Sequence, residues 1–179
     1  MKITLEWLEE NNACVNGVAW FKAQSETDGG MVVRALVVAK KFEWANWTIA
    51  HLLNRKNQIL YAVFAAGQVL HIFEDKYPGE LAPRRAIEAA RAVAENDTHK
   101  NRNAAMNASV TSWSAASTVR STSWIAAYPA CSASYAARSA SATSWSTANT
   151  AYLAADAAGD TMLKKIVEHG IELYEEENA

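Results

Sequence analysis

The sequence predicts an all-α fold, a compact helical bundle in which long Ala/Ser-rich helices pack closely. Three observations support this prediction. The chain of 179 residues has only three prolines and seven glycines, its apolar side chains recur every three or four residues, and its second half is rich in small side chains with regularly spaced aromatic residues. The length suits one domain, 1–179, with an apolar and charged helical half (1–96) and an Ala/Ser/Thr-rich helical half (97–179).

Four short helices are expected at the start of the chain. Thr4 is placed to cap the first helix, and the small and polar residues 27–30 predict a turn after the second. The third contains Val-Val pairs, which leave a strand as the alternative. The expected spans are 4–11, 13–26, 31–39 and 44–54.

Two longer helices are expected next. Apolar side chains follow helical spacing over residues 59–76. Pro78 ends this helix because proline cannot continue the backbone hydrogen-bond ladder. Pro83 suits the first turn of the following helix, at residues 83–95.

The composition changes at residues 104–157, where 36 of the 54 residues are Ala, Ser or Thr and three are charged. Aromatic residues recur there at spacings of 11, 11, 10 and 7, and eleven residues make about three helical turns. Pro129 lies in the middle of the segment. We therefore expect two long antiparallel helices, 97–128 and 130–157, broken near Pro129.

Small side chains let helix axes approach closely, with aromatic rings filling the remaining space. Trp113, Trp124 and Trp145 are therefore expected to be mostly buried, and serine hydroxyls to donate to a carbonyl one turn back in their own helix. Gly159 predicts the end of one helix and Asp160 the cap of the next. This last helix is expected to have a frayed acidic end.

Charge and cysteine content argue against several classes of protein. The net charge is −2 and the basic residues are scattered, so a nucleic-acid partner is not expected. No apolar run is long enough to cross a bilayer and the first residues do not resemble a signal peptide, so we expect a cytoplasmic protein without a membrane partner. Cys14 and Cys131 are expected to be buried thiols. Neither the cysteines nor the four histidines have ligand spacing, so no metal or cofactor is expected.

Two stretches resemble a known family. Residues 73–79 (FEDKYPG) and 83–91 (PRRAIEAAR) are similar to a phrase in the Imm-5-like immunity-protein family of bacteria and phages, and the opening of the chain is similar to phage-encoded members. Ala82 stands where that family usually has its first arginine, and Glu80 replaces a nearby aspartate. The resemblance implies an immunity or counter-defence role, in the cytoplasm of the host cell if the protein is phage-encoded.

Arg84, Arg85 and Arg91 in the second stretch are candidate ligands for an anion. Arg84 and Arg91 are seven residues apart and therefore share a helix face, near a helix N-terminus that favours negative charge. Surface ion pairs to Glu80 and Glu88 are the structural alternative.

Arg120 and Arg138 are isolated cations in the small-residue segment. Arg120 precedes Trp124 by four residues and Arg138 follows Tyr135 by three, so each guanidinium can stack on a neighbouring ring. Such a pair is either structural or able to hold a planar anionic ligand such as a nucleotide.

These patterns favour binding over catalysis, because no nucleophile–base grouping is visible in the sequence. The first hypothesis is a non-enzymatic protein that binds a partner protein, and the alternative binds or sequesters a small nucleotide signal. The low charge of residues 104–157 also predicts that this segment is covered, by the rest of the chain, by a second copy in a homodimer or by a partner.

Overall fold

The computed structural model describes residues 1–120, 123–140 and 144–179, and it confirms the all-α helical bundle. In the described residues, extended pairing is limited to one isolated bridge between Lys2 and Asp28. The helices are α1 (Leu5–Glu10), α2 (Val15–Lys22), α3 (Gly29–Val38), α4 (Phe42–Leu52), α5 (Arg55–Glu74), α6 (Ala82–Glu95), α7 (His99–Arg120), α8 (Trp124–Ser139), α9 (Ser144–Ala158) and α10 (Asp160–Asn178).

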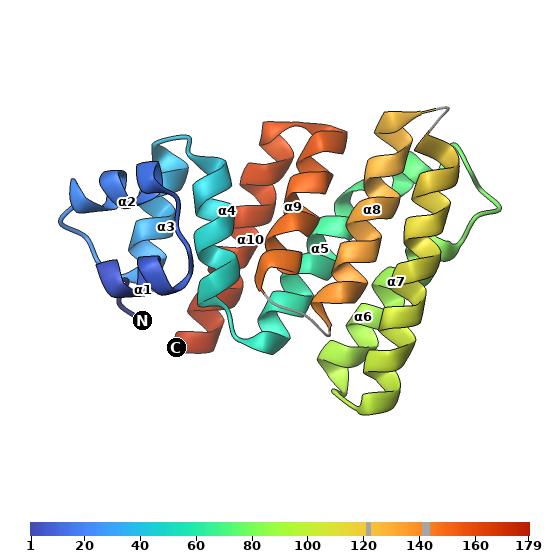
Figure 1. Ribbon diagram of the computed structural model, residues 1–179, viewed down its shortest axis with the longest axis horizontal. Coiled ribbons are helices and arrows are strands. Elements are labelled where there is room, and N and C mark those ends of the chain that lie inside the picture. Colours follow the sequence, from blue (N-terminus) through green and yellow to red (C-terminus); the bar gives the residue numbers. More distant parts are fainter. Residues whose placement is uncertain (121–122, 141–143) are drawn as a thin grey trace.

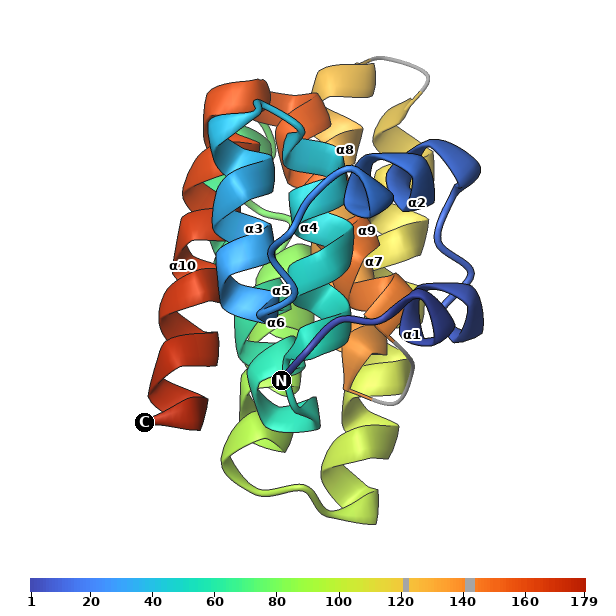
Figure 2. The same ribbon diagram turned by 90° about the vertical axis from the view of Figure 1, so that its left-hand side faces the viewer.

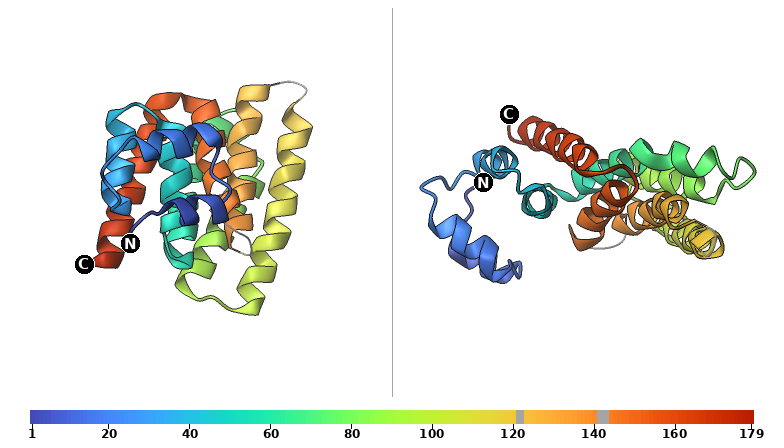
Figure 3. Two further views of the ribbon diagram at one scale, coloured as in Figure 1. Left: turned by 60° about the vertical axis from the view of Figure 1, so that its left-hand side comes forward. Right: turned by 90° about the horizontal axis from the view of Figure 1, so that it is seen from above.

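The helices are arranged in layers (Figure 1). Helices α7, α8 and α9 lie antiparallel beside one another, and α5 and α6 pack behind them, as the view from above shows (Figure 3). Helix α10 packs against α3, α4, α5 and α9. The short helices α1 and α2 lie at the end of the molecule opposite α6 and α7 (Figure 1), and the view turned by 90° faces that end (Figure 2). Tyr61 and Phe73 on α5 are the largest fully buried side chains.

The early helices begin at polar caps, as the sequence predicts. Thr4 accepts a hydrogen bond from the Trp7 backbone N–H at 3.1 Å, and Asp28 accepts one from Met31 at 3.1 Å. The prediction of a turn over 27–30 was wrong at its second half, because Gly29 and Gly30 already belong to α3. A Cβ at Gly29 would come within 3.0 Å of the Leu52 side chain, so the glycines serve close packing there.

The prediction of two long helices broken near Pro129 was wrong. Three antiparallel helices occupy the segment, and Pro129 lies buried inside α8. Proline removes one N–H from the ladder, the one that would meet the Ile125 carbonyl, and the helix continues past it. Thr122 and Thr143, which each precede one of the regularly spaced tryptophans by two residues, lie outside the described residues.

The expected burial of the three tryptophans was also wrong, since Trp113, Trp124 and Trp145 are 43%, 55% and 57% exposed. The contacts between helices are made by small side chains instead. The buried residues of α8 are almost all Ala or Ser, and Ala130, Ala133, Ala136 and Ala137 are fully buried. Helix axes this close leave no room for an indole, so the regular aromatic spacing marks the outer face.

Buried serines link neighbouring helices as well as turns of one helix. Ser112 donates to the Ala130 carbonyl at 2.7 Å, and Ser132 donates to the Thr150 carbonyl at 2.9 Å. Thr150 shows the expected bond within one helix, donating to the Ser146 carbonyl at 2.9 Å. The small-residue contacts are therefore polar and directional. Among the described residues, the Thr147 hydroxyl on α9 is the one buried side-chain group without a hydrogen-bond partner.

The end of the chain is ordered, contrary to the expected fraying. Gly159 adopts a positive φ of 87° between α9 and α10, which confirms the predicted stop and start. Helix α10 then continues to Asn178, where Glu177 accepts from the Asn54 backbone N–H at 3.1 Å. The acidic tail thus meets the N-terminus of α5, which favours negative charge.

Candidate functional site

Two features stand out as candidate sites, an exposed aromatic surface on α7–α9 and a cleft beside α4. The first is made by side chains from all three small-residue helices. We call it the aromatic face and define it by Trp113, Arg120, Trp124, Tyr135, Arg138 and Trp145.

Tyr135 lies at the centre of the aromatic face. Its ring meets Trp113 of α7 edge to face, with ring centroids 6.1 Å apart, and meets Trp145 of α9 in the same way at 5.6 Å. Edge-to-face pairs at this separation are favourable. The three rings therefore form a continuous strip across three helices.

Both predicted cation–ring pairs are present. The guanidinium carbon of Arg120 lies 4.0 Å from the centroid of the Trp124 ring, and that of Arg138 lies 5.5 Å from the Tyr135 ring. The structure thus joins four of the seven residues singled out from the sequence to one surface. The signal that predicted these pairs is helical spacing of three or four residues.

The three arginines of α6 differ in their contacts. Arg84 is already engaged, with its Nε and a terminal nitrogen 2.7 and 2.6 Å from the two Glu74 oxygens, and this bond raises the pKa of Arg84. Its partner is therefore Glu74, in place of the suggested Glu80 or Glu88. Arg85 and Arg91 are exposed on a helix that packs against α5, α7 and α8.

The start of α6 is also occupied. The Glu80 side chain accepts a hydrogen bond from the Ala82 backbone N–H at 2.9 Å. A carboxylate of the protein itself therefore takes the position that an anionic ligand would use. Arg84 therefore fits the structural alternative of a surface ion pair, while an anion site at Arg85 and Arg91 stays a prediction.

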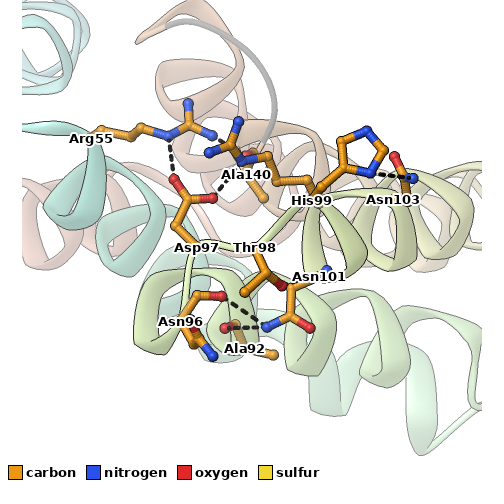
Figure 4. Close-up of polar contacts among 10 residues, drawn as sticks. Arg55, Ala92, Asn96, Asp97, Thr98, His99, Asn101, Asn103 and Ala140 are labelled. Carbon is orange, nitrogen blue, oxygen red and sulfur yellow. Dashed lines mark hydrogen bonds and ion pairs between the residues drawn. The ribbon is translucent and has the colours of Figure 1, made fainter.

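A second polar cluster holds the turn between α6 and α7 (Figure 4). Asp97 accepts from Arg102 at 2.5 Å and from Arg55 at 3.1 Å, and the bond from Arg102 keeps the pKa of Asp97 below its ordinary value. Arg55 also donates to the Ala140 carbonyl, which ends α8. This cluster ties α5, α7 and α8 together and is structural in its geometry.

The cleft is the feature that the sequence did not predict. It has a volume of about 320 Å³ and lies between the turn joining α1 to α2 on one side and α3, α4 and α9 on the other. Trp20, Trp44, Trp47 and Tyr152 line it with aromatic surface. Residues more than a hundred positions apart meet here, so no local pattern in the sequence could have revealed it.

The polar groups of the cleft are few. The Tyr152 hydroxyl donates to the backbone carbonyl of Glu43 at 3.0 Å, and burial, together with the nearby Glu43 carboxylate, raises the pKa of Tyr152 to about 12. Cys14 also lines the cleft. It is exposed, which corrects the prediction of a buried thiol, and its sulfur accepts from the Gly17 N–H at 3.4 Å. Cys131 is half-buried.

An aromatic cluster supports the α4 side of the cleft. The His51 ring lies 4.3 Å from that of Trp47, and Trp7 meets both edge-on at 5.8 and 6.3 Å. Burial lowers the pKa of His51, although its Nδ1 bonds to the Trp47 carbonyl at 2.7 Å. Burial therefore favours the neutral imidazole, in which Nδ1 donates to the Trp47 carbonyl.

Among the described residues, no group of three or more His, Cys, Asp or Glu side chains is placed to hold a metal ion. None of the described helices combines the length and apolar character that crossing a bilayer requires. The chain matches no protein family, and neither a curated protein nor a solved structure was found to be similar to it.

Proposed function

We propose that this protein works without chemistry, by binding a partner protein on the aromatic face of α7–α9. The observation that carries the proposal is the exposure of three tryptophans on neighbouring helices whose buried side chains are almost all small. Tryptophan, tyrosine and arginine are the residue types that dominate binding energy at protein interfaces. The aromatic face consists of these three types alone.

Further apolar side chains are exposed on α7 and α8. Met106 and Val110 share the outer side of α7 with Trp113 by helical spacing, and Ile125 follows Trp124 on α8. A contiguous exposed apolar patch on one face is a feature of interaction sites. The rings are also held in place before binding by their contacts with one another, which reduces the entropy lost on association.

Charge on the aromatic face indicates the chemistry of the partner. Arg120 and Arg138 supply positive charge beside the rings. A complementary partner surface therefore presents an apolar centre with carboxylates nearby. The resemblance to Imm-5-like proteins suggests the more specific role, an immunity or counter-defence factor that occupies a bacterial or phage protein. A second copy of this chain is the competing occupant.

A small-ligand role remains the second candidate, because an arginine stacked on a tryptophan can also hold a planar anion. Nucleotide binding would raise the melting temperature by mass action. The change should be lost in Arg120→Gln. A nucleotide that stabilises the wild type and fails to stabilise this variant would favour the alternative over the protein partner.

Site-specific photo-crosslinking tests the proposal in the native host cell. A photoreactive phenylalanine at position 145 on the aromatic face is compared with one at position 38, which is 84% exposed on α3. We expect one defined adduct from position 145 and none from position 38. An adduct with twice the mass of the chain identifies a homodimer. Absence of any adduct from position 145 contradicts the proposal.

A further inference from the structure

We propose that the cleft beside α4 is a binding site for an organic ammonium group that carries an apolar body. The proposal concerns a different surface from the aromatic face and does not depend on the protein partner. The cleft has a volume of about 320 Å³, at the low end of the range for small-ligand sites. Three features of the cleft favour such a ligand: its aromatic rings, its charge and its apolar floor.

Aromatic rings reach the cleft from three helices. Trp20 comes from α2, Trp44 and Trp47 from α4, and Tyr152 from α9. Ring faces attract cations through their quadrupole, and sites lined by several rings bind ammonium groups in this way. The hydrogen bond from Tyr152 to the Glu43 carbonyl fixes one of these rings next to the acidic residue.

Glu43 gives the cleft its charge. Of the described residues that line the cleft, Glu43 is the one with a formal charge at neutral pH. None of the ion pairs between described residues involves it. A cation near the rings therefore gains a carboxylate partner, whereas the phosphates of a nucleotide would be repelled.

The floor of the cleft is apolar and closed. Ile3, Leu8, Val32 and Leu36 line it and are each no more than 6% exposed, while Glu43 is exposed. The apolar body of a ligand is thus best placed on the floor, with its ammonium group toward Glu43 and the rings. A ligand without an apolar body would leave this surface uncovered.

The positive charge of Lys41 repels a cationic ligand in the cleft. Its Nζ lies 4.4 Å from the centroid of the Trp44 ring, although Lys41 is not among the residues that line the cleft. The contact shows that this indole accepts a cation. It also means that removing the lysine charge should tighten binding of a cationic ligand.

Two matched ligands separate cation recognition from simple apolar binding. Choline and 3,3-dimethyl-1-butanol have nearly the same shape, and only choline is charged. Binding is followed by shifts of the tryptophan indole signals in NMR spectra of the full chain. We expect choline to bind at least roughly fivefold more tightly than the alcohol, and hexyltrimethylammonium to bind more tightly still.

Variants locate the site and the charge effect. Glu43→Gln should remove most of the preference for choline, Lys41→Gln should increase it, and the control Glu10→Gln on α1 should leave it unchanged. Bound ammonium should also slow alkylation of Cys14, which lines the cleft, and leave Cys131 unaffected. The two thiols thus act as site and control within one molecule.

A final pair of ligands distinguishes a free ammonium compound from a protein side chain. A short peptide with trimethyl-lysine is compared with the same peptide carrying lysine and with hexyltrimethylammonium. Tighter binding of the peptide identifies a modified protein as the source, and tighter binding of the free compound identifies a small molecule. Equal binding of choline and its neutral analogue, or no saturable binding of any ammonium compound at millimolar concentration, overturns the proposal.

Discussion

The guanidinium carbon of Arg120 lies 4.0 Å from the centroid of the Trp124 ring, and the pair joins the last residue of α7 to the first residue of α8. The indole is held against its neighbour and is still more than half exposed. This combination of a fixed position with an open face is what a binding surface needs. The exposure of the Trp124 ring also predicts that its removal changes the free energy of unfolding little.

Trp124→Ala should cost less than about 1 kcal/mol of unfolding free energy, because the ring loses one exposed cation–π contact. Phe73→Ala is the contrasting variant, since Phe73 is fully buried on α5, and it should cost about 3–5 kcal/mol. Urea unfolding measures both. Equal losses would place Trp124 in the core and contradict the aromatic face.

Gly170→Ala should destabilise the protein by about 1–3 kcal/mol. A Cβ at Gly170 would lie 2.6 Å from the Tyr61 ring and 2.9 Å from Ile49, both of which are buried. Gly67→Ala is the control in α5, because a Cβ there meets nothing within 4 Å. It should be neutral or stabilising by up to about 1 kcal/mol, since alanine favours the helix.

Ala137→Leu should cost about 1–3 kcal/mol by overpacking the close contact of α8 with its neighbours. Ala137 is fully buried, and Ala126, with 2% exposure, should respond in the same direction. Ala104→Leu on the exposed side of α7 is the matched control and should change the midpoint little. The midpoint of thermal or urea unfolding is measured for the three leucine variants. Similar midpoints for all three would rule out close packing at Ala137 and Ala126.

Stability should fall between neutral and mildly acidic pH because of His51. Burial lowers the pKa of His51 from its ordinary 6.5, so the unfolded chain takes up the proton more readily than the folded protein. The His51 contribution is complete above about pH 6.5 and is lost as the pH falls toward the folded pKa. Urea unfolding at pH 7.5 and at pH 5.5 measures the decline in unfolding free energy. Part of this decline should vanish in His51→Phe and persist in His99→Gln, a variant of an exposed histidine.

The sequence predicted the helical class and most helix positions, because apolar spacing and caps such as Thr4 are local signals. It also predicted that Arg120 stacks on Trp124, which depends on residues four apart. It predicted the wrong inward side for the small-residue helices, because it expected Trp113, Trp124 and Trp145 to be buried. An 11-residue aromatic spacing keeps rings on one side of a helix, but the close approach allowed by residues such as Ala133 decides that this side is outside.

The cleft shows the other limit of sequence reasoning. Cys14 and Tyr152 line it together, although one precedes α2 and the other lies on α9. Helix α9 packs against α4, and this places Tyr152 beside the cleft. In the same way, the acidic end at Glu177 resembles a solvated tail until its contact with Asn54 is known.

The most direct test of the account is the affinity of the purified partner captured from position 145. It should be measured by calorimetry against the wild type, the double variant Trp113→Ala/Trp145→Ala, and the control Val38→Ser. Loss of two rings that flank Tyr135 should weaken binding at least roughly thirtyfold, as expected for interface hot spots, while the control binds like the wild type. A double variant that is folded and binds within about twofold of the wild type would contradict the assignment of the aromatic face as the binding surface.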